Sequence, residues 1–250
     1  MAWDPDLGDQ PDPSWRTEAP DILSPIDANA PVSGHHAPVD APAGPSQAPE
    51  HDWLAAEPLL FPVLRPAATS GVRVDEIDAD RLAAEGMKSH GAPILETGPC
   101  GLAVGYVLRA DAFDIHVNAD HLLAWGASPA ELRNTAMANL ARWSATAPWT
   151  EEVSGERRLL SSASGTGDDA ARILLPEVRD HIAAGLGSDV RILVGIPEAD
   201  LLVAGSLAGG DEEFAALFAE FIRGHAADAD LPLDQRVLEL AGGELRLFEG

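Results

Sequence analysis

The distribution of proline and charge divides this chain into two segments that differ in their capacity to fold. Ten of its 20 prolines fall within the first 50 residues, and residues 1–52 hold ten acidic side chains against one basic one, Arg16. No apolar residue in this segment recurs at the period of a strand or a helix. Such a segment cannot bury enough apolar surface to offset its loss of conformational entropy. We therefore expect residues 1–52 to be a disordered, acidic, Pro-rich tail and residues 53–250 to form one domain.

The charge of the whole chain limits the partners that it can bind. Its 250 residues carry a net charge of -25, with 41 acidic against 16 basic side chains. Nucleic acids and anionic membrane surfaces are themselves negative and would repel it. We expect no nucleic-acid or membrane partner and favour a protein partner with a basic or apolar surface, leaving the oligomeric state open. Trp3 and Trp15 form a candidate partner motif in the tail, the alternative being a tail that only solubilises.

The sequence lacks the signals of export and of a metal site. Its first residues show no basic segment followed by an apolar one, and no stretch approaches the ~20 apolar residues that cross a bilayer. We expect a cytoplasmic protein. The single cysteine, Cys100, excludes an internal disulfide framework, and His116 and His121 lack metalloprotease spacing. We therefore expect no cofactor and no metal.

Apolar runs between turn residues predict a mainly antiparallel sheet. In the run over residues 113–118, Phe113, Ile115 and Val117 alternate with polar residues, so these three are expected to face inward. Pro62 interrupts another apolar run and favours the edge of a sheet, where a missing N–H is tolerated. Short connections predict that most neighbouring strands form hairpins. The runs expected to form strands include residues 59–65, 94–97, 102–108, 113–118, 190–196, 201–204, 237–240 and 244–248.

About three helices are expected to pack on this sheet. Ser128-Pro-Ala-Glu131 is a capping box that begins a helix running to about Ser144. A second helix should start near residues 167–169, and Pro176 should kink it or split it in two. A third covers residues 211–223, with an apolar stripe of Phe214, Leu217, Phe218 and Phe221. The predicted class is α+β with a mainly antiparallel sheet.

No residue is assigned a catalytic role, because the sequence lacks a nucleophile elbow and a phosphate-binding loop. Asn139 lies mid-helix, where asparagine is unfavourable, so we favour a hydrogen bond to a loop backbone, with a ligand contact as the alternative. Asp168 and Asp169 are spaced for an ion pair with Arg172, expected to be solvated. If the two helices face each other, Asn139, Asp169 and Arg172 would form a ligand-binding cleft.

Five short motifs of this chain resemble the YtpQ-like family of uncharacterised bacterial proteins, a domain of unknown function. They are Phe61–Arg65, Val117–Trp125, Ala136–Leu140, Gly167–Leu174 and Ile196–Val203. Their order and spacing match together, and the resemblance covers roughly residues 60–250. It supports one folded domain and implies no known activity, cofactor or substrate.

Three hypotheses for function follow from the sequence. The favoured one is a non-catalytic binding or interaction domain with a flexible acidic arm. The second is an enzyme that acts on a small or peptide substrate in a cleft near Asn139, Asp169 and Arg172. The third is an acidic immunity-like or regulatory protein that masks a basic surface.

Overall fold

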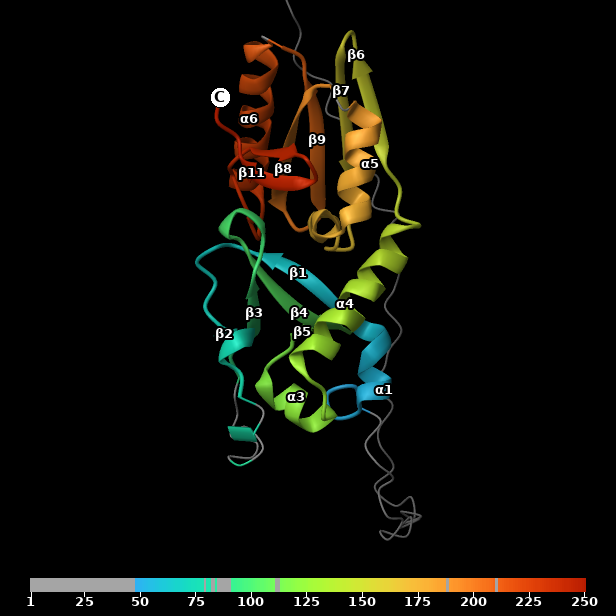
Figure 1. The fold of residues 1–250 in the computed structure, drawn as a ribbon, viewed down its shortest axis with the longest axis vertical. Helices are drawn as coiled ribbons and strands as arrows, with labels where there is room; N and C mark the ends of the chain where they lie inside the picture. The colour runs from blue at the N-terminus through green and yellow to red at the C-terminus, as the bar shows by residue number, and fades with distance from the viewer. Residues whose placement is uncertain are drawn as a thin grey trace, which may run out of the picture. The chain divides into compact units, whose positions relative to one another are not determined.

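The computed structural model describes residues 48–78, 80–81, 84, 91–110, 113–187, 189–209 and 211–250 (Figure 1). These residues form an α+β fold whose strands make two mainly antiparallel sheets, which confirms the expected class. Residues 44–250 cluster as one compact unit. The expected tail lies almost wholly outside the described residues. The five α-helices described, more than the three expected, are α1 (Trp53–Ala56), α3 (Ala119–Trp125), α4 (Pro129–Ser144), α5 (Pro176–Leu186) and α6 (Glu212–Asp228).

The first sheet is built around a central strand, β4. Strand β1 pairs with one side of β4, and β3 and β5 pair with successive halves of its other side, all antiparallel. The short β2 pairs with β3 in parallel. The antiparallel pairing is as expected, but β3 and β5 share one side of β4 instead of flanking it, because β1 occupies the other side. Pro62 lies on an edge strand, as predicted. The strands are β1 (Leu60–Arg65), β2 (Val72–Arg73), β3 (Ile94–Thr97), β4 (Ala103–Arg109) and β5 (Asp114–His116).

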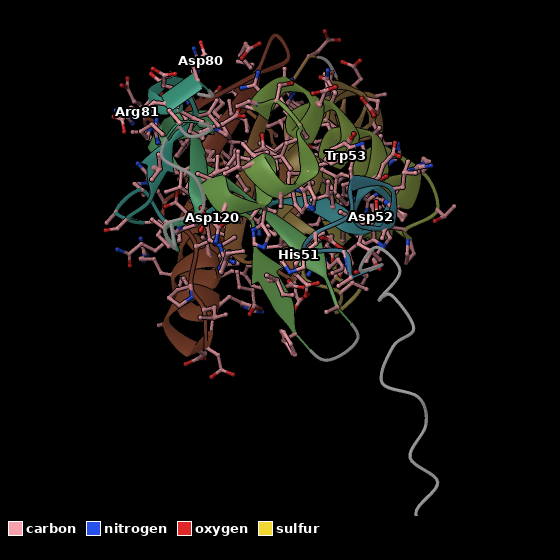
Figure 2. The ribbon with its side chains drawn as sticks, turned by 90° about the horizontal axis from the view of Figure 1, so that it is seen from below. His51, Asp52, Trp53, Asp80, Arg81 and Asp120 are labelled. Carbon is pink, nitrogen blue, oxygen red and sulfur yellow. The ribbon has the colours of Figure 1, made fainter. Side chains whose placement is uncertain are left out.

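Helix α4 begins at the predicted capping box and packs along β1. The Ser128 hydroxyl accepts a hydrogen bond from the Glu131 amide, and the Glu131 carboxylate accepts one from the Ser128 amide. Two further contacts fix residues 49–52, which precede α1. Trp125 Nε1 donates to the Pro49 carbonyl at 2.8 Å, and Asp52 caps α1, at whose start Figure 2 shows it beside Trp53. Residues 49–52 therefore contact the folded unit.

The second sheet is entirely antiparallel, in the order β11-β10-β8-β9-β7-β6. The predicted hairpins over residues 197–200 and 242–243 are present. Because side chains alternate along β8 and β9, one face packs against α5 and the opposite face against α6 (Figure 1). The strands are β6 (Thr150–Ser154), β7 (Arg157–Ser162), β8 (Arg191–Glu198), β9 (Leu201–Leu207), β10 (Leu238–Ala241) and β11 (Glu244–Leu247).

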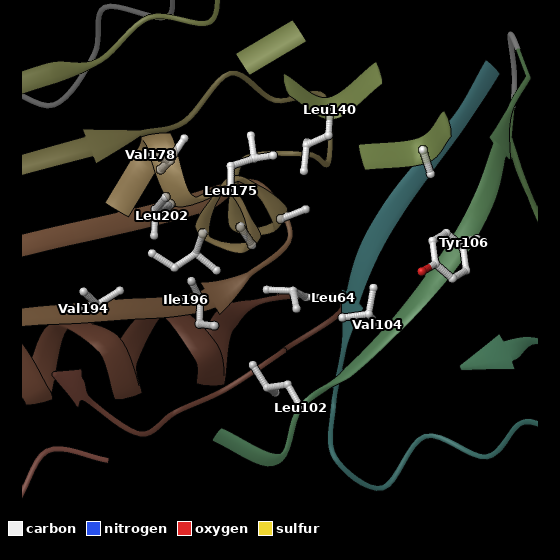
Figure 3. Packing of buried hydrophobic residues seen from close by; sticks show 14 of the residues in the cluster. Leu64, Leu102, Val104, Tyr106, Leu140, Leu175, Val178, Val194, Ile196 and Leu202 are labelled. Atoms are coloured by element: carbon white, nitrogen blue, oxygen red, sulfur yellow. The ribbon is translucent and has the colours of Figure 1, made fainter. Parts of the chain in front are cut away.

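One hydrophobic core joins the two sheets. Leu64 and Val104 of the first sheet belong to the same buried cluster as Ile196 of the second, and Leu175 belongs to it as well (Figure 3). A smaller cluster lies under α6 on the far face of the second sheet. The α5 face of the second sheet thus packs into the core that the two sheets share, whereas its α6 face packs against that helix.

Several local expectations need correction or refinement. Pro176 splits the second expected helix into the 3₁₀ helix η4 (Ala170–Leu174) and α5, because proline cannot donate the hydrogen bond that would continue the helix. Phe113, expected to face inward, is exposed because β5 starts only at Asp114, after the turn. The expectation was right for Val117, which is fully buried.

Candidate functional site

Arg172 and Asp169 are buried, and this corrects the expectation of a solvated ion pair. Their relative exposures are 1% and 0%. The pair is bridged: the Arg172 guanidinium donates to the Ser162 hydroxyl, which donates to Asp169 Oδ1. The other carboxylate oxygen accepts from the amide and hydroxyl of Ser164, at 2.9 and 2.6 Å. The two charges lie inside because η4 packs between the two sheets rather than on the surface.

The remaining faces of the Arg172 guanidinium are also occupied. Nε donates to the Ser144 hydroxyl at 3.0 Å, and Nη2 donates to the Ser144 carbonyl at 3.1 Å. The guanidinium carbon lies 4.2 Å from the ring centre of Trp149 and 5.7 Å from that of Trp143. Burial lowers the pKa of Arg172, and the nearby Asp169 carboxylate opposes this shift. This network joins the end of α4 to β7 and η4, so its geometry is that of a structural clamp.

Asn139 belongs to a separate set of hydrogen bonds. Its side-chain amide donates to the carbonyls of Glu57 and Leu60, at 2.7 and 2.8 Å, and its oxygen accepts from Arg142. These contacts confirm the favoured hydrogen bond from mid-helix to backbone, but the acceptors belong to the short 3₁₀ helix η1 (Glu57–Leu59) and to β1 instead of a loop. The structure thus brings Asp169 and Arg172 together and places Asn139 against the start of β1. Trp3 and Trp15 lie outside the described residues.

A surface groove of about 410 Å³ lies beside α6, on the face of the second sheet opposite α5. We call it the α6 groove. It lies where α6 packs mainly on β8 and β9 and contacts β7 only near the start of the helix, through Arg157 and Leu159. Among the described residues, no helix packs on this face of β6. Its floor is Leu159 and Val203, one wall is Phe214, Leu217, Phe218 and Phe221, and the opposite wall is Glu152, Val153, Ser154 and Arg157.

The apolar wall of the α6 groove is partly open to solvent. Leu217 and Phe221 are 50% and 42% exposed, whereas Phe214 and Phe218 are buried against the sheet. The sheet therefore buries only two of the four apolar residues in the predicted stripe. The buried positions repeat every four residues, through Ile222, and Leu217 and Phe221 lie on the flank of the helix. The width of that stripe was the sequence signal for this groove.

The rim of the α6 groove is acidic. Arg157 forms a two-pronged ion pair with Asp211, each contact 2.8 Å long, and a third contact with Glu213 at 2.9 Å. These hydrogen bonds raise the pKa of Arg157 and lower that of Asp211. Glu152 on the opposite wall has no basic partner among the described residues. Two carboxylates thus contact the Arg157 guanidinium and Glu152 adds a third, so the border of the apolar floor is negative.

Comparison of this chain with family models, with curated proteins and with solved structures finds no match. The resemblance to the YtpQ-like family therefore stays a prediction from five short motifs. Within the described ranges, no helix is both long and apolar enough to span a membrane. The same residues contain no group of three or more His, Cys, Asp or Glu side chains placed to hold a metal ion.

Proposed function

We propose that this chain is a non-catalytic interaction domain, and that its α6 groove binds a partner segment carrying a large apolar side chain flanked by Lys or Arg. The observation that carries this proposal is the exposure of Leu217 and Phe221 on the wall of an apolar groove. Contiguous exposed apolar surface with a polar rim is typical of protein-binding sites.

The energetics support an apolar anchor. Burying the exposed halves of Leu217 and Phe221 under a partner would contribute about 1 kcal/mol each, since full burial of such side chains is worth roughly 1.5–3 kcal/mol. A groove of about 410 Å³ is in the range of pockets that hold a few side chains. The partner would gain most by filling it with one aromatic or aliphatic residue.

The charge of the groove and of the chain supports basic flanks. Glu152 and the carboxylates around Arg157 lie at the rim, and the chain as a whole carries -25. Lys and Arg beside the anchor would approach this rim favourably, and acidic segments would be rejected. The acidic N-terminal residues of the sequence add to the same attraction.

Selection of displayed random peptides on the full chain tests this proposal. We expect the enriched peptides to combine one large apolar residue with Lys or Arg. Leu217→Glu should weaken their binding by about tenfold or more, because it places a charge in the groove. Leu231→Glu is the matched control, since Leu231 is exposed and lies outside the groove. Enrichment of no peptide, or equal binding by both variants, would contradict the proposal.

A further inference from the structure

Strand β6, which forms one wall of the α6 groove, is the last strand of the second sheet, and no other described strand pairs with its outer edge. All five of its residues are exposed, and it pairs with β7 in regular register along its whole length. It contains no proline, lysine or bulge, so its two glutamates are the charged residues that protect this edge from unwanted pairing. The β1 edge of the first sheet differs from the β6 edge, because β1 carries Pro62 and lies under α4.

The register of the β6–β7 hairpin shows which backbone groups of β6 point outward. A two-residue loop, residues 155–156, joins the strands, and Ser154 pairs with Arg157 across it. In such a hairpin the pair flanking the loop is hydrogen-bonded, and the pairs then alternate. Thr150, Glu152 and Ser154 therefore bond to β7, and the N–H and C=O groups of Glu151 and Val153 face away from it.

A side-chain contact supports this assignment. Arg158, the partner of Val153, donates its backbone N–H to the hydroxyl of Ser206 on β9, at 3.1 Å. The Ser206 hydroxyl also approaches the Arg158 carbonyl, at 3.5 Å. Arg158 thus turns its backbone groups away from β6, so it does not exchange hydrogen bonds with Val153. Two outward N–H groups and two outward C=O groups remain for another strand.

The charges of β6 select among possible strands. Its sequence is Thr-Glu-Glu-Val-Ser, and antiparallel pairing with the β6 of a second copy would set Glu152 opposite Glu152 in one register and Glu151 opposite Glu151 in another. Like charges on paired strands are destabilising, whereas Lys or Arg opposite a glutamate is favourable. Glu151 already forms an ion pair with Arg158, and Glu152 has no basic partner among the described residues. The edge is therefore unfavourable for self-association and suited to a basic strand.

We propose that the partner segment binds as an added β-strand along β6, with large apolar side chains on the groove face and Lys or Arg on the opposite face, beside Glu151. This inference rests on the proposed function, because it specifies how the same segment binds. Glu152 and Ser154 lie on the groove face, since Glu152 pairs with Leu159 of the groove floor. The added strand would lie about 10 Å from β7, two strand spacings away, so its apolar side chains would lie beside Glu152 and Ser154 and lean across them toward the groove.

The test uses a fluorescein-labelled peptide of alternating residues, Lys-Phe-Lys-Leu-Lys-Phe-Lys, with the full chain and fluorescence anisotropy as the readout. Two N-methylated forms have the same side chains: one is methylated on the Phe and Leu amides, the other on the inner Lys amides. Along a strand these two sets of amides face opposite edges. We expect one form to keep binding and the other to lose about tenfold or more in affinity.

On the protein side, Val153→Pro removes an outward N–H that β7 does not use, and Val153→Thr is the control that retains it. Of these two variants, we expect only Val153→Pro to weaken binding of the peptide, by about tenfold. Hydrogen exchange on the unmodified chain provides a readout that needs no variant to fold. The amides of Glu151 and Val153 should exchange more slowly when the peptide is bound.

The outcomes separate this inference from the proposed function. If Leu217→Glu abolishes peptide binding while both N-methylated forms bind equally and the two amides gain no protection, the added strand is wrong and the groove proposal stands. If no peptide binds, both fail. Concentration-dependent dimerisation that Val153→Pro abolishes would assign the edge to a second copy and overturn the inference.

Discussion

Arg172 shows how a charged side chain is accommodated inside this fold. Its donors are taken up by Ser144, Ser162 and backbone carbonyls, and the carboxylate of Asp169 lies one hydroxyl away. A buried charge is tolerable only when such partners surround it. These hydrogen bonds occupy the polar groups of Arg172 and Asp169, which leaves neither side chain available to bind a ligand. We therefore assign both residues a structural role.

Replacing Arg172 therefore predicts a large loss of stability. Arg172→Met should lower the free energy of unfolding by roughly 3–5 kcal/mol, because Asp169 is left buried without a compensating charge. Adding Asp169→Asn should recover part of the loss. Urea denaturation provides the measurement, with Arg223→Met on the exposed side of α6 as the control. A loss no larger than that of the control would show that the clamp contributes little.

Glu239 predicts how stability depends on pH. The carboxylate is buried between Arg191 and Arg246, and hydrogen bonds from them lower its pKa from 4.5 to about 2. A carboxyl whose pKa falls on folding stabilises the protein above the unfolded pKa and loses this contribution as pH falls. The expected loss between pH 4.5 and 2 is roughly 1–2 kcal/mol, reduced by the solvent exposure of both arginines.

The measurement is the free energy of unfolding of the unmodified chain and of Glu239→Gln across that interval. The variant should be less stable near neutral pH, and its stability should fall less steeply as acid is added. Parallel curves for the two proteins would contradict the assignment.

At the scale of elements, the position of α6 depends on a close approach to β8. Gly195 faces the helix, and a β-carbon built at this position would overlap the Cδ1 atom of Ile222. Gly205 of β9 allows a second close approach, because a β-carbon there would lie 2.9 Å from the Phe214 ring. The position of α6 beside the groove therefore depends on two glycines in the second sheet.

Gly195→Ala should destabilise the protein by roughly 1–3 kcal/mol, the usual cost of overpacking a core. Ile222→Val removes Cδ1, the atom closest to the added β-carbon, so the double variant should be more stable than Gly195→Ala alone. Thermal unfolding of the two single variants and the double variant gives the coupling between the positions. Strictly additive changes in stability would contradict the close approach, because they would mean that α6 shifts away from the added methyl group without cost.

Elements with strong local signals could be predicted from the sequence. The capping box at Ser128 fixed the start of α4, and Pro62 placed β1 at an edge, because both effects act within one turn or one strand. The division of the apolar stripe of α6 was not predictable. Whether Leu217 is buried depends on how far β7 and β6 extend beyond the helix, and those strands lie over 50 positions earlier in the sequence.

At the scale of the whole described unit, two sheets share one core. Leu64 and Ile196 come from different sheets and lie in one buried cluster (Figure 3). Such sharing couples the stability of the sheets, since neither could expose its face to water without cost.

We therefore expect residues 48–250 to unfold in one transition. Leu64→Ala should remove roughly 2–5 kcal/mol of stability and lower the midpoint of both sheets together. Amide exchange on β4 and β8 reports the two sheets separately. If the β4 amides of Leu64→Ala exchange faster while the β8 amides stay protected, the two sheets unfold independently.

By itself, the sequence determined the α+β class, the antiparallel hairpins, the cap of α4 and the break at Pro176, because these follow from contacts between residues close along the chain. Only the tertiary structure decided that Asp169 and Arg172 are buried, that there are two sheets and that Leu217 and Phe221 line a groove. Each of these outcomes depends on which distant segments cover a side chain, and no local pattern contains that information.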